Sequence, residues 1–174
     1  MKIRVLLLTT IVLFIFSCLG YANQFTMQEC SLGGISMHMK PDQVISIYGE
    51  PTEKRGEFDV GKTGYFKYGD TIQIKFVNGD VWAILSTGDN GWKLPSGIAV
   101  GDRLKDVTDL YGKVNPEKGS RGITYLWYSE AKGFNGCALE VSVEYSTNLN
   151  ENSKITSIQV FTGGASAIDK REEF

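Results

Sequence analysis

Few side chains in this sequence have the types and the spacing that catalysis or metal binding requires. His38 is the only histidine among the 174 residues, and it lies between Met37 and Met39 with no acid or nucleophile signalled beside it. A serine nucleophile needs a histidine base that is oriented by an acid, so neither Ser96 nor Ser120 belongs to a plausible triad. With one histidine, the chain also fits a zinc site poorly. We therefore predict no catalytic residue, no metal site and no cofactor, and we expect that the protein is not an enzyme.

The three cysteines, Cys18, Cys30 and Cys137, have the clearest chemistry in the chain. If the first 22 residues are removed on export, Cys30 and Cys137 remain. In an exported chain the default expectation for such a pair is a disulfide, and the alternative is two separate thiols. The bond would close a loop of over a hundred residues, which the loop-entropy model values at ~4 kcal/mol.

Residues 1–22 have the composition of an export signal. Lys2 and Arg4 form a short basic start, residues 5–16 are almost entirely apolar, and small residues lead up to Ala22. The apolar run is too short for a transmembrane helix and fits a signal peptide that is cleaved after Ala22. A lipoprotein signal with lipidation at Cys18 is the alternative. We expect a secreted or periplasmic protein, or in the alternative a membrane-anchored lipoprotein.

The charge balance argues against two classes of partner. The chain has 18 basic and 20 acidic residues, and loss of Lys2 and Arg4 would leave 16 basic residues against the same 20 acidic ones. A mildly acidic chain has no electrostatic footprint for nucleic acid or for anionic lipid. We therefore expect no nucleic-acid partner, and membrane association only if Cys18 is lipidated.

One short pattern occurs twice, and it indicates a duplicated unit. A Gly-Ile step is followed by a short amphipathic helix that ends in Tyr-Gly. The helix of the first copy begins near Pro41, which suits a first helical turn, and Asp102 is the expected N-cap of the second. The matched positions, each 63 residues apart, are Gly34 and Gly97, Ile35 and Ile98, Met37 and Val100, Val44 and Val107, Ile47 and Leu110, Tyr48 and Tyr111, and Gly49 and Gly112.

Alternating apolar and polar residues after each helix predict three strands per copy. Asn78-Gly79 is a strong hairpin signal within the first set. The pattern predicts an α+β fold of two tandem helix-plus-antiparallel-meander repeats that form one continuous sheet with the helices on one face. We assign residues 1–22 to the signal peptide, 23–94 to the first repeat with its linker, 95–163 to the second repeat and 164–174 to a charged tail. The expected strands are 65–68, 72–76, 81–85, 123–128, 138–145 and 155–161.

Strand alternation also predicts which side chains face away from the helices. Ser157 and Gln159 flank Ile158 and Val160, which should therefore be the buried pair of the last strand; by alignment Ala83 and Leu85 are then buried in the first copy. Lys67 is hard to bury, which fixes the phase of its own strand and of the aligned strand. The free face would then carry the partner-binding residues Tyr65, Lys67, Trp82, Ile84, Tyr125 and Trp127. The alternative is that loops or the tail cover these rings, or that they line the seam between the copies.

The Gly-Ile step, the Val-x-x-x-Tyr-Gly helix and the meander, in tandem behind an export signal, resemble the beta-lactamase inhibitory protein fold. A single unit of this kind, with a Gly-x-Pro helix exit such as Gly49-Glu50-Pro51, is similar to the small outer-membrane lipoproteins of the barrel-assembly machinery. In the inhibitor family an aromatic sheet face grips the target enzyme. Members typically have one disulfide within each repeat, whereas a bond between Cys30 and Cys137 would cross between the repeats.

These observations predict an exported, non-enzymatic binding module. It would engage a protein partner in the envelope or the extracellular space through an aromatic sheet face, and inhibition of an enzyme is one form of this. Aromatic residues mixed with a few charges are typical of protein-binding hot spots. The alternatives are a lipid-anchored adaptor for envelope assembly and a module that binds a glycan or another small ligand.

Overall fold

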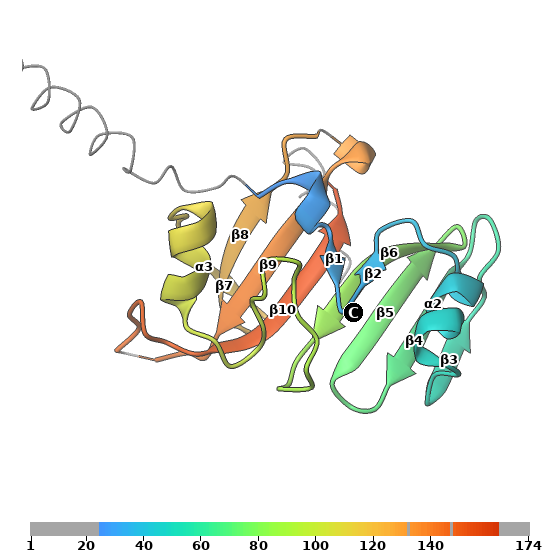
Figure 1. The fold of residues 1–174 in the computed structure, drawn as a ribbon, viewed down its shortest axis with the longest axis horizontal. Coiled ribbons are helices and arrows are strands. Elements are labelled where there is room, and N and C mark those ends of the chain that lie inside the picture. The colour runs from blue at the N-terminus through green and yellow to red at the C-terminus, as the bar shows by residue number, and fades with distance from the viewer. Residues whose placement is uncertain (1–24, 132, 147, 164–174) are drawn as a thin grey trace, which may run out of the picture.

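Two α-helices lie against one face of an eight-stranded antiparallel sheet (Figure 1). The structure is a computed structural model, and it describes residues 25–131, 133–146 and 148–163. The expected signal peptide, Cys18 and the expected tail 164–174 lie outside the described residues. The predicted α+β class and the continuous antiparallel sheet with its helices on one face are confirmed.

The first half of the sheet follows helix α2 along the chain. The helix spans Pro41–Tyr48, and strands β3 (Glu53–Gly56), β4 (Thr63–Tyr68), β5 (Ile72–Val77) and β6 (Asp80–Ser86) pair antiparallel in that order. The predicted hairpin turn joins β5 to β6. Asn78 and Gly79 have φ values of 56° and 77°, as a two-residue turn of this kind requires.

The second half follows helix α3, which spans Leu104–Tyr111. Its strands are β7 (Glu117–Gly119), β8 (Gly122–Tyr128), β9 (Cys137–Val143) and β10 (Ile155–Thr162). The order across the sheet is β3-β4-β5-β6-β10-β9-β8-β7. Strands β6 and β10 therefore join the two halves at the centre, with Val160 opposite Ile84 and Phe161 opposite Ala83.

The edge strands β3 and β7 were not predicted, because we expected three strands in each half. Both are short and rich in charge, with the sequences Glu-Lys-Arg-Gly and Glu-Lys-Gly. Charged side chains on a short edge strand discourage pairing with another chain. The same charges remove the apolar alternation by which a strand is recognised in a sequence.

Helix α2 packs through a narrower face than the sequence predicts. Val44 is fully buried, and Ile45 packs partly buried against the core. Ile47, which was expected on the same apolar face, is 50% exposed. Tyr48 lies at the surface, where its ring stacks on Trp92 with 4.5 Å between ring centres.

Helix α3 is more deeply buried than α2. Leu104, Val107 and Tyr111 are buried on its sheet side. The N-cap is Arg103 and not the expected Asp102, because the carboxylate of Asp102 accepts a hydrogen bond from the Ala99 N–H instead. Asp106 supplies the missing acceptor, at 3.1 Å from the Arg103 N–H.

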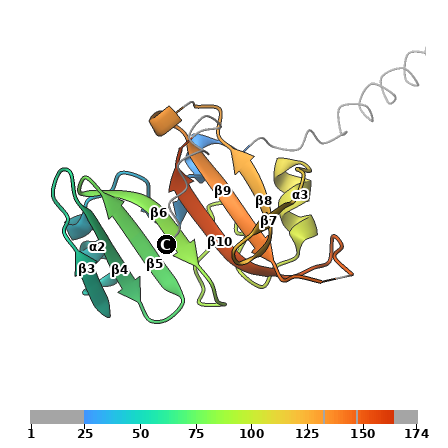
Figure 2. The ribbon, with the colours of Figure 1, turned by 180° about the vertical axis from the view of Figure 1, so that it is seen from behind.

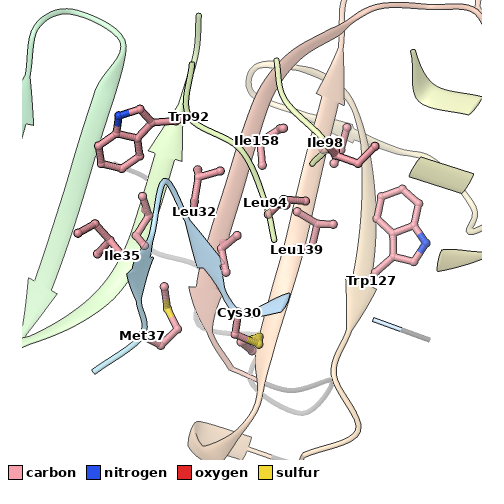
Figure 3. Packing of buried hydrophobic residues seen from close by; sticks show 14 of the residues in the cluster. Cys30, Leu32, Ile35, Met37, Trp92, Leu94, Ile98, Trp127, Leu139 and Ile158 are labelled. Atoms are coloured by element: carbon pink, nitrogen blue, oxygen red, sulfur yellow. A yellow bond between two sulfur atoms is a disulfide. The ribbon is translucent and has the colours of Figure 1, made fainter. Parts of the chain in front are cut away.

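A short hairpin and a disulfide close the space between the two helices (Figure 3). Strands β1 (Ser31–Leu32) and β2 (Ile35–Ser36) lie over the helix-side face of the sheet, together with Leu94 and Ile98 of the segment between the halves. The predicted disulfide between Cys30 and Cys137 is present, with 6.1 Å between the two Cα atoms. It ties this hairpin to strand β9.

Candidate binding surface

The sheet face that carries no helix is the candidate binding surface, and it points toward the viewer in Figure 2. We call this surface the outer face. Strand register places its side chains, since residues that pair across neighbouring strands point to the same side. The outer face comprises Tyr65, Lys67, Gln73, Lys75, Trp82, Ala83, Leu85, Leu126, Tyr128, Ala138, Glu140, Gln159 and Phe161.

A buried lysine between two aromatic rings marks the first half of the outer face. The Nζ atom of Lys75 lies 5.1 Å from the ring centre of Trp82 and 5.9 Å from that of Tyr65. These distances are within the range of cation–π attraction. Lys75 is only 2% exposed, whereas Tyr65 and Trp82 are half-buried and present part of each ring.

A β-bulge explains why Trp82 faces outward. Lys75 pairs with Ala83 and Phe76 pairs with Val81, so Trp82 is an extra residue in β6. A bulge places two successive residues opposite one on the partner strand. Trp82 and Ala83 consequently both lie on the outer face, where they belong to one apolar cluster.

A shallow, charged groove lies beside Tyr65 at the β3 edge. It encloses about 270 Å³ and is lined by Glu53, Arg55, Tyr65, Lys67 and Gln73. The carboxylate of Glu53 pairs with Arg55 and, at 3.4 Å, with Lys67. The hydrogen bond from Arg55 and the charge of Lys67 hold the pKa of Glu53 below its ordinary value, so both cations remain next to an ionised carboxylate at neutral pH.

The second half of the outer face is more deeply buried. Ala138, Leu126 and Phe161 form an apolar cluster with Ala83, and Trp82 and Tyr128 pack against its rim. Little of the cluster is exposed to solvent: the exposed fractions are 0% for Ala83, 0% for Ala138, 6% for Phe161 and 8% for Leu126.

An ion pair crosses the same half of the outer face. The Arg121 guanidinium lies 2.8 Å from the Glu140 carboxylate and 2.5 Å from the Gln159 amide oxygen. Glu140 is 8% exposed and Gln159 is 9% exposed. Burial of a carboxylate is tolerated when it is paired and hydrogen-bonded in this way.

Tyr125 and Trp127 do not belong to the outer face, and their predicted role there is wrong. Both are buried in the helix-side core (Figure 3 labels Trp127), at 7% and 4% exposure. The indole N–H of Trp127 donates to the carbonyl of Gly112 at the end of α3, over 2.9 Å. The error came from the alignment, which matched Tyr65 with Tyr125; in the structure Phe66, not Tyr65, shares the helix-side face with Tyr125.

The prediction for Ile84 is also wrong. Ile84 is fully buried in the helix-side core, and Ala83 and Leu85 are buried on the outer face rather than under the helices. The bulge at Trp82 reverses the alternation from Ala83 onward, and no feature of the sequence 81–85 signals it. Of the six proposed partner-binding residues, the structure brings together Tyr65, Lys67 and Trp82 on one face.

The sequence did not predict the contribution of two residues, Arg55 and Phe161, to this surface. Arg55 enters through the unpredicted strand β3, and Phe161 lies beside Trp82 with 6.3 Å between ring centres. The position of Lys75 between two aromatic rings depends on the bulge in β6. A charged run next to an aromatic strand is the only signal that could have pointed to Arg55.

The described residues form neither a metal-binding cluster nor a membrane-spanning helix. Within the described ranges, no three side chains of the histidine, cysteine, aspartate and glutamate types gather closely enough to hold a metal ion. His38 is exposed and has a φ of 66°, and its backbone N–H donates to the Val81 carbonyl over 2.9 Å. None of the helices formed by the described residues has the length and apolar character needed to cross a bilayer.

No model of a protein family matches the chain, and no curated protein matches it. Among solved structures, a cysteine-rich secretory protein from Staphylococcus aureus subsp. aureus Mu50 is similar at 14% identity, over 80% of this chain and 49% of that one, with a TM-score of 0.49. An extracellular protein containing a SCP domain from Bacillus anthracis str. Ames is similar at 11% identity, over 83% of this chain and 48% of that one, with a TM-score of 0.47. The chain thus spans about half the length of the solved structures that it matches. At these values the similarity transfers neither an activity nor a partner to this chain.

Proposed function

We propose that the protein is an exported, non-enzymatic binding module that engages a protein partner through the outer face of its sheet. The observation that carries this proposal is the row of Tyr65, Lys75 and Trp82, which presents two half-buried aromatic rings on a face without helices. Tyrosine, tryptophan and arginine are the residues most enriched among binding hot spots. Rings that are already held in place lose little conformational entropy when a partner covers them.

The accessible part of this surface has a defined chemistry. Arg55 and Lys67 border the groove next to Tyr65, and their side chains are 68% and 38% exposed. A partner that lays an apolar side chain over the exposed parts of the Tyr65 and Trp82 rings and places a carboxylate near Arg55 and Lys67 would complement it. Charges at the edge of an interface chiefly set the rate of association and the choice of partner.

Export is part of the proposal, and the disulfide supports it. A bond between Cys30 and Cys137 persists in oxidising compartments and is rare where thiols are kept reduced. The protein would therefore act outside the cytoplasm, either free or, in the alternative, anchored through a lipid on Cys18. The mass of the first peptide of the protein isolated from its own cells distinguishes these two forms.

We also propose that the two halves arose as a tandem duplication of the beta-lactamase inhibitory protein type. The order of one helix followed by four antiparallel strands supports this, because it occurs first as α2 to β6 and again as α3 to β10. Val44 and Val107 are both fully buried, and Gly49 and Gly112 end the two helices with φ values of 75° and 84°. Both glycine conformations lie in the region that disfavours other residues.

The proposal is tested by affinity capture with two matched variants. The double variant Tyr65→Ala/Trp82→Ala removes both rings from the outer face, and Ile47→Ala removes an exposed apolar side chain from α2 on the opposite side of the sheet. The immobilised proteins are incubated with envelope extract and culture medium, and the bound proteins are quantified by mass spectrometry. We expect a protein that the wild type and Ile47→Ala retain and that the double variant loses. Equal retention by all three would refute the role of the outer face.

A further inference from the structure

We propose that a groove on the helix side of the sheet binds a cationic amphipathic segment of another protein. We call this site the helix-side groove; it lies between the start of α2, strand β3, the loop of residues 57–62 and the β5–β6 turn (Figure 1). Its volume is about 590 Å³, which is within the usual range of ligand sites. None of its lining residues belongs to the outer face, so the proposal does not rest on the proposed function.

The apolar part of the helix-side groove is anchored in the core. The ring centre of Phe58 lies 4.9 Å from that of Phe66 and 5.3 Å from that of Phe76. Ile45 of α2 also packs partly buried against the core. Phe58 and Ile45 both line the groove and are only partly buried, so each presents apolar surface to it. An apolar side chain of a ligand would remove this surface from water, which is the dominant driving force of most protein associations.

An exposed valine stands in the lining of the groove, on a loop that is held in place. Val60 is 86% exposed. The Gly61 N–H donates to the side-chain oxygen of Asn78 over 2.8 Å, and the Asn78 N–H donates to the Lys62 carbonyl over 2.9 Å. These bonds tie the loop to the β5–β6 turn. A contact residue on a loop that is already ordered loses little conformational entropy when a ligand covers it.

The two lysines that line the helix-side groove are already paired with carboxylates. Lys40 lies 2.5 Å from the carboxylate of Asp80, and Lys54 lies 2.6 Å from that of Glu50. The Nζ atom of Lys54 is also 5.4 Å from the ring centre of Phe66, which is within the range of cation–π attraction. The lysines therefore give the groove no net positive charge.

Two aspartates give the groove its unbalanced charge. Asp42 lies in the first turn of α2 and Asp59 lies on the loop, so they approach the groove from two different elements. Within the described part of the chain, neither carboxylate forms an ion pair or accepts a hydrogen bond. The N-terminus of α2 adds about half a positive charge, which offsets only part of the two negative ones. The groove therefore favours a ligand that combines an apolar body with cationic groups.

The openness of the site favours a peptide segment over a small molecule. Both aspartates, Lys54 and Val60 are exposed, whereas a site for a small molecule usually buries most of the ligand surface. Open grooves with an apolar lining are typical of peptide recognition, in which a few side chains act as anchors. The occupant that we infer is a segment of another protein with an apolar residue flanked by arginines or lysines.

Strands β3 and β4 would then have a binding site on each side. Lys54 pairs with Phe66 and both line the helix-side groove, whereas the next pair in register, Arg55 and Tyr65, lies on the outer face. Ligands on the two sides would not compete for the same side chains. The protein would thus hold two ligands at once, and this consequence alone rests on the proposed function.

The first test follows the amide signals of the isotope-labelled full chain by nuclear magnetic resonance during titration with capped peptides. The probes are acetyl-Arg-Phe-Arg-amide and the acidic control acetyl-Glu-Phe-Glu-amide. We expect the cationic peptide to shift the amide signals of Gly61, Asn78 and Gly79 and to leave that of Gly112 in the second half unchanged. It should bind at least about tenfold more tightly than the acidic peptide, and most of this preference should disappear at about 1 M salt, where charges are screened within about 3 Å. Equal binding of the two peptides, or no shift at these amides, would overturn the proposal.

Matched variants assign the effect to the groove. Asp42→Asn/Asp59→Asn removes both charges with little change in shape, and it should reduce the preference for the cationic peptide to about twofold or less, because charge complementarity sets this choice. Glu57→Gln is the control, because this carboxylate is on the same loop but outside the groove, where it pairs with Lys62 at 3.0 Å. The control should bind like the wild type. Full preference in the double aspartate variant would contradict the proposal.

Two further arms separate the other occupants. If phenethylammonium, a small cation with the same ring, binds as tightly as the cationic peptide, the groove is a site for small organic cations and the proposed segment is wrong. If the signals of Gly61 and Asn78 shift when the protein alone is concentrated, the occupant is a second copy of the chain. The variant Tyr65→Ala/Trp82→Ala should bind the cationic peptide like the wild type, so failure of this proposal and failure of the proposed function are distinguishable.

Discussion

Lys75 lies with its ammonium group 5.1 Å from the ring centre of Trp82, and this contact exists because of a single extra residue in β6. Without the bulge, strict alternation would place Trp82 and Ala83 on opposite faces. The bulge instead turns the tryptophan toward the lysine on the neighbouring strand. Bulges occur preferentially where a strand must redirect a side chain, which fits a binding surface at this point of the sheet.

The two tryptophans on either side of the sheet should respond differently to truncation. Trp127→Ala removes a buried ring and its hydrogen bond to Gly112, so we expect a loss of about 3–5 kcal/mol in the free energy of unfolding. Trp82→Ala removes a half-buried ring at the surface and should cost about 1 kcal/mol. Urea unfolding followed by circular dichroism measures both. Equal losses would mean that the two faces of the sheet have been assigned incorrectly.

The two helices should be anchored by equivalent valines. Val44 and Val107 are both fully buried, and replacing either by alanine should lower the free energy of unfolding by on the order of 2 kcal/mol through lost burial and a residual cavity. Ile47→Ala on the exposed side of α2 is the control and should change it by less than about 0.5 kcal/mol. If the valine variants unfold at the same urea concentration as the control, the helices contribute little to the core.

The disulfide should contribute strongly to stability because it closes a long loop. The two cysteines are 107 residues apart in sequence, and the loop-entropy model then gives about 4 kcal/mol. We expect the variant Cys30→Ser/Cys137→Ser to lose up to this amount in urea unfolding. Alkylation of the wild type without reductant should label neither cysteine. Quantitative labelling of both would show that the bond does not form in the isolated protein.

Stability above pH 10 should depend on Tyr111. Burial, and the hydrogen bond that its hydroxyl donates to Glu29 over 2.9 Å, raise the pKa of Tyr111 above the ordinary value of 10.0. The folded protein therefore retains a proton that the unfolded chain releases, so this part of the stability is fully present below pH 10 and is lost as the pH rises above it. The free energy of unfolding should fall more gently between pH 10 and 12 in Tyr111→Phe than in the wild type. Parallel curves would mean that the hydroxyl ionises equally well in both states.

The middle strands and the helix anchors could be predicted because their patterns are local. Ile72, Ile74 and Phe76 alternate with polar residues, as in a strand with one buried face, and all three are buried in the helix-side core. The disulfide was predicted from the number of cysteines that would be left if residues 1–22 were removed on export. In each case the residues that carry the signal are the same residues that make the contact.

The parts that could not be predicted depend on relations between strands. The bulge at Trp82 is defined by how β6 pairs with β5, and the sequence around Trp82 carries no signal of it. It reversed the expected faces of Ala83, Ile84 and Leu85. The sheet face of Tyr125 was inferred by aligning its strand with the strand of Tyr65, so that the two tyrosines matched. A shift by one residue exchanges the two faces of a strand, so a small error in alignment assigned Tyr125 and Trp127 of β8 to the wrong face.

The central claim is that Tyr65 and Trp82 form a binding surface, and the most direct measurement is the dissociation constant of a captured partner for single-ring variants. Calorimetric titration compares the wild type with Trp82→Ala, Tyr65→Ala and Ile47→Ala under conditions in which all four proteins are fully folded. Central aromatic anchors contribute 2 kcal/mol or more, so each outer-face variant should bind at least about 30-fold more weakly, while Ile47→Ala should bind like the wild type. Dissociation constants that are unchanged in both outer-face variants would contradict the account.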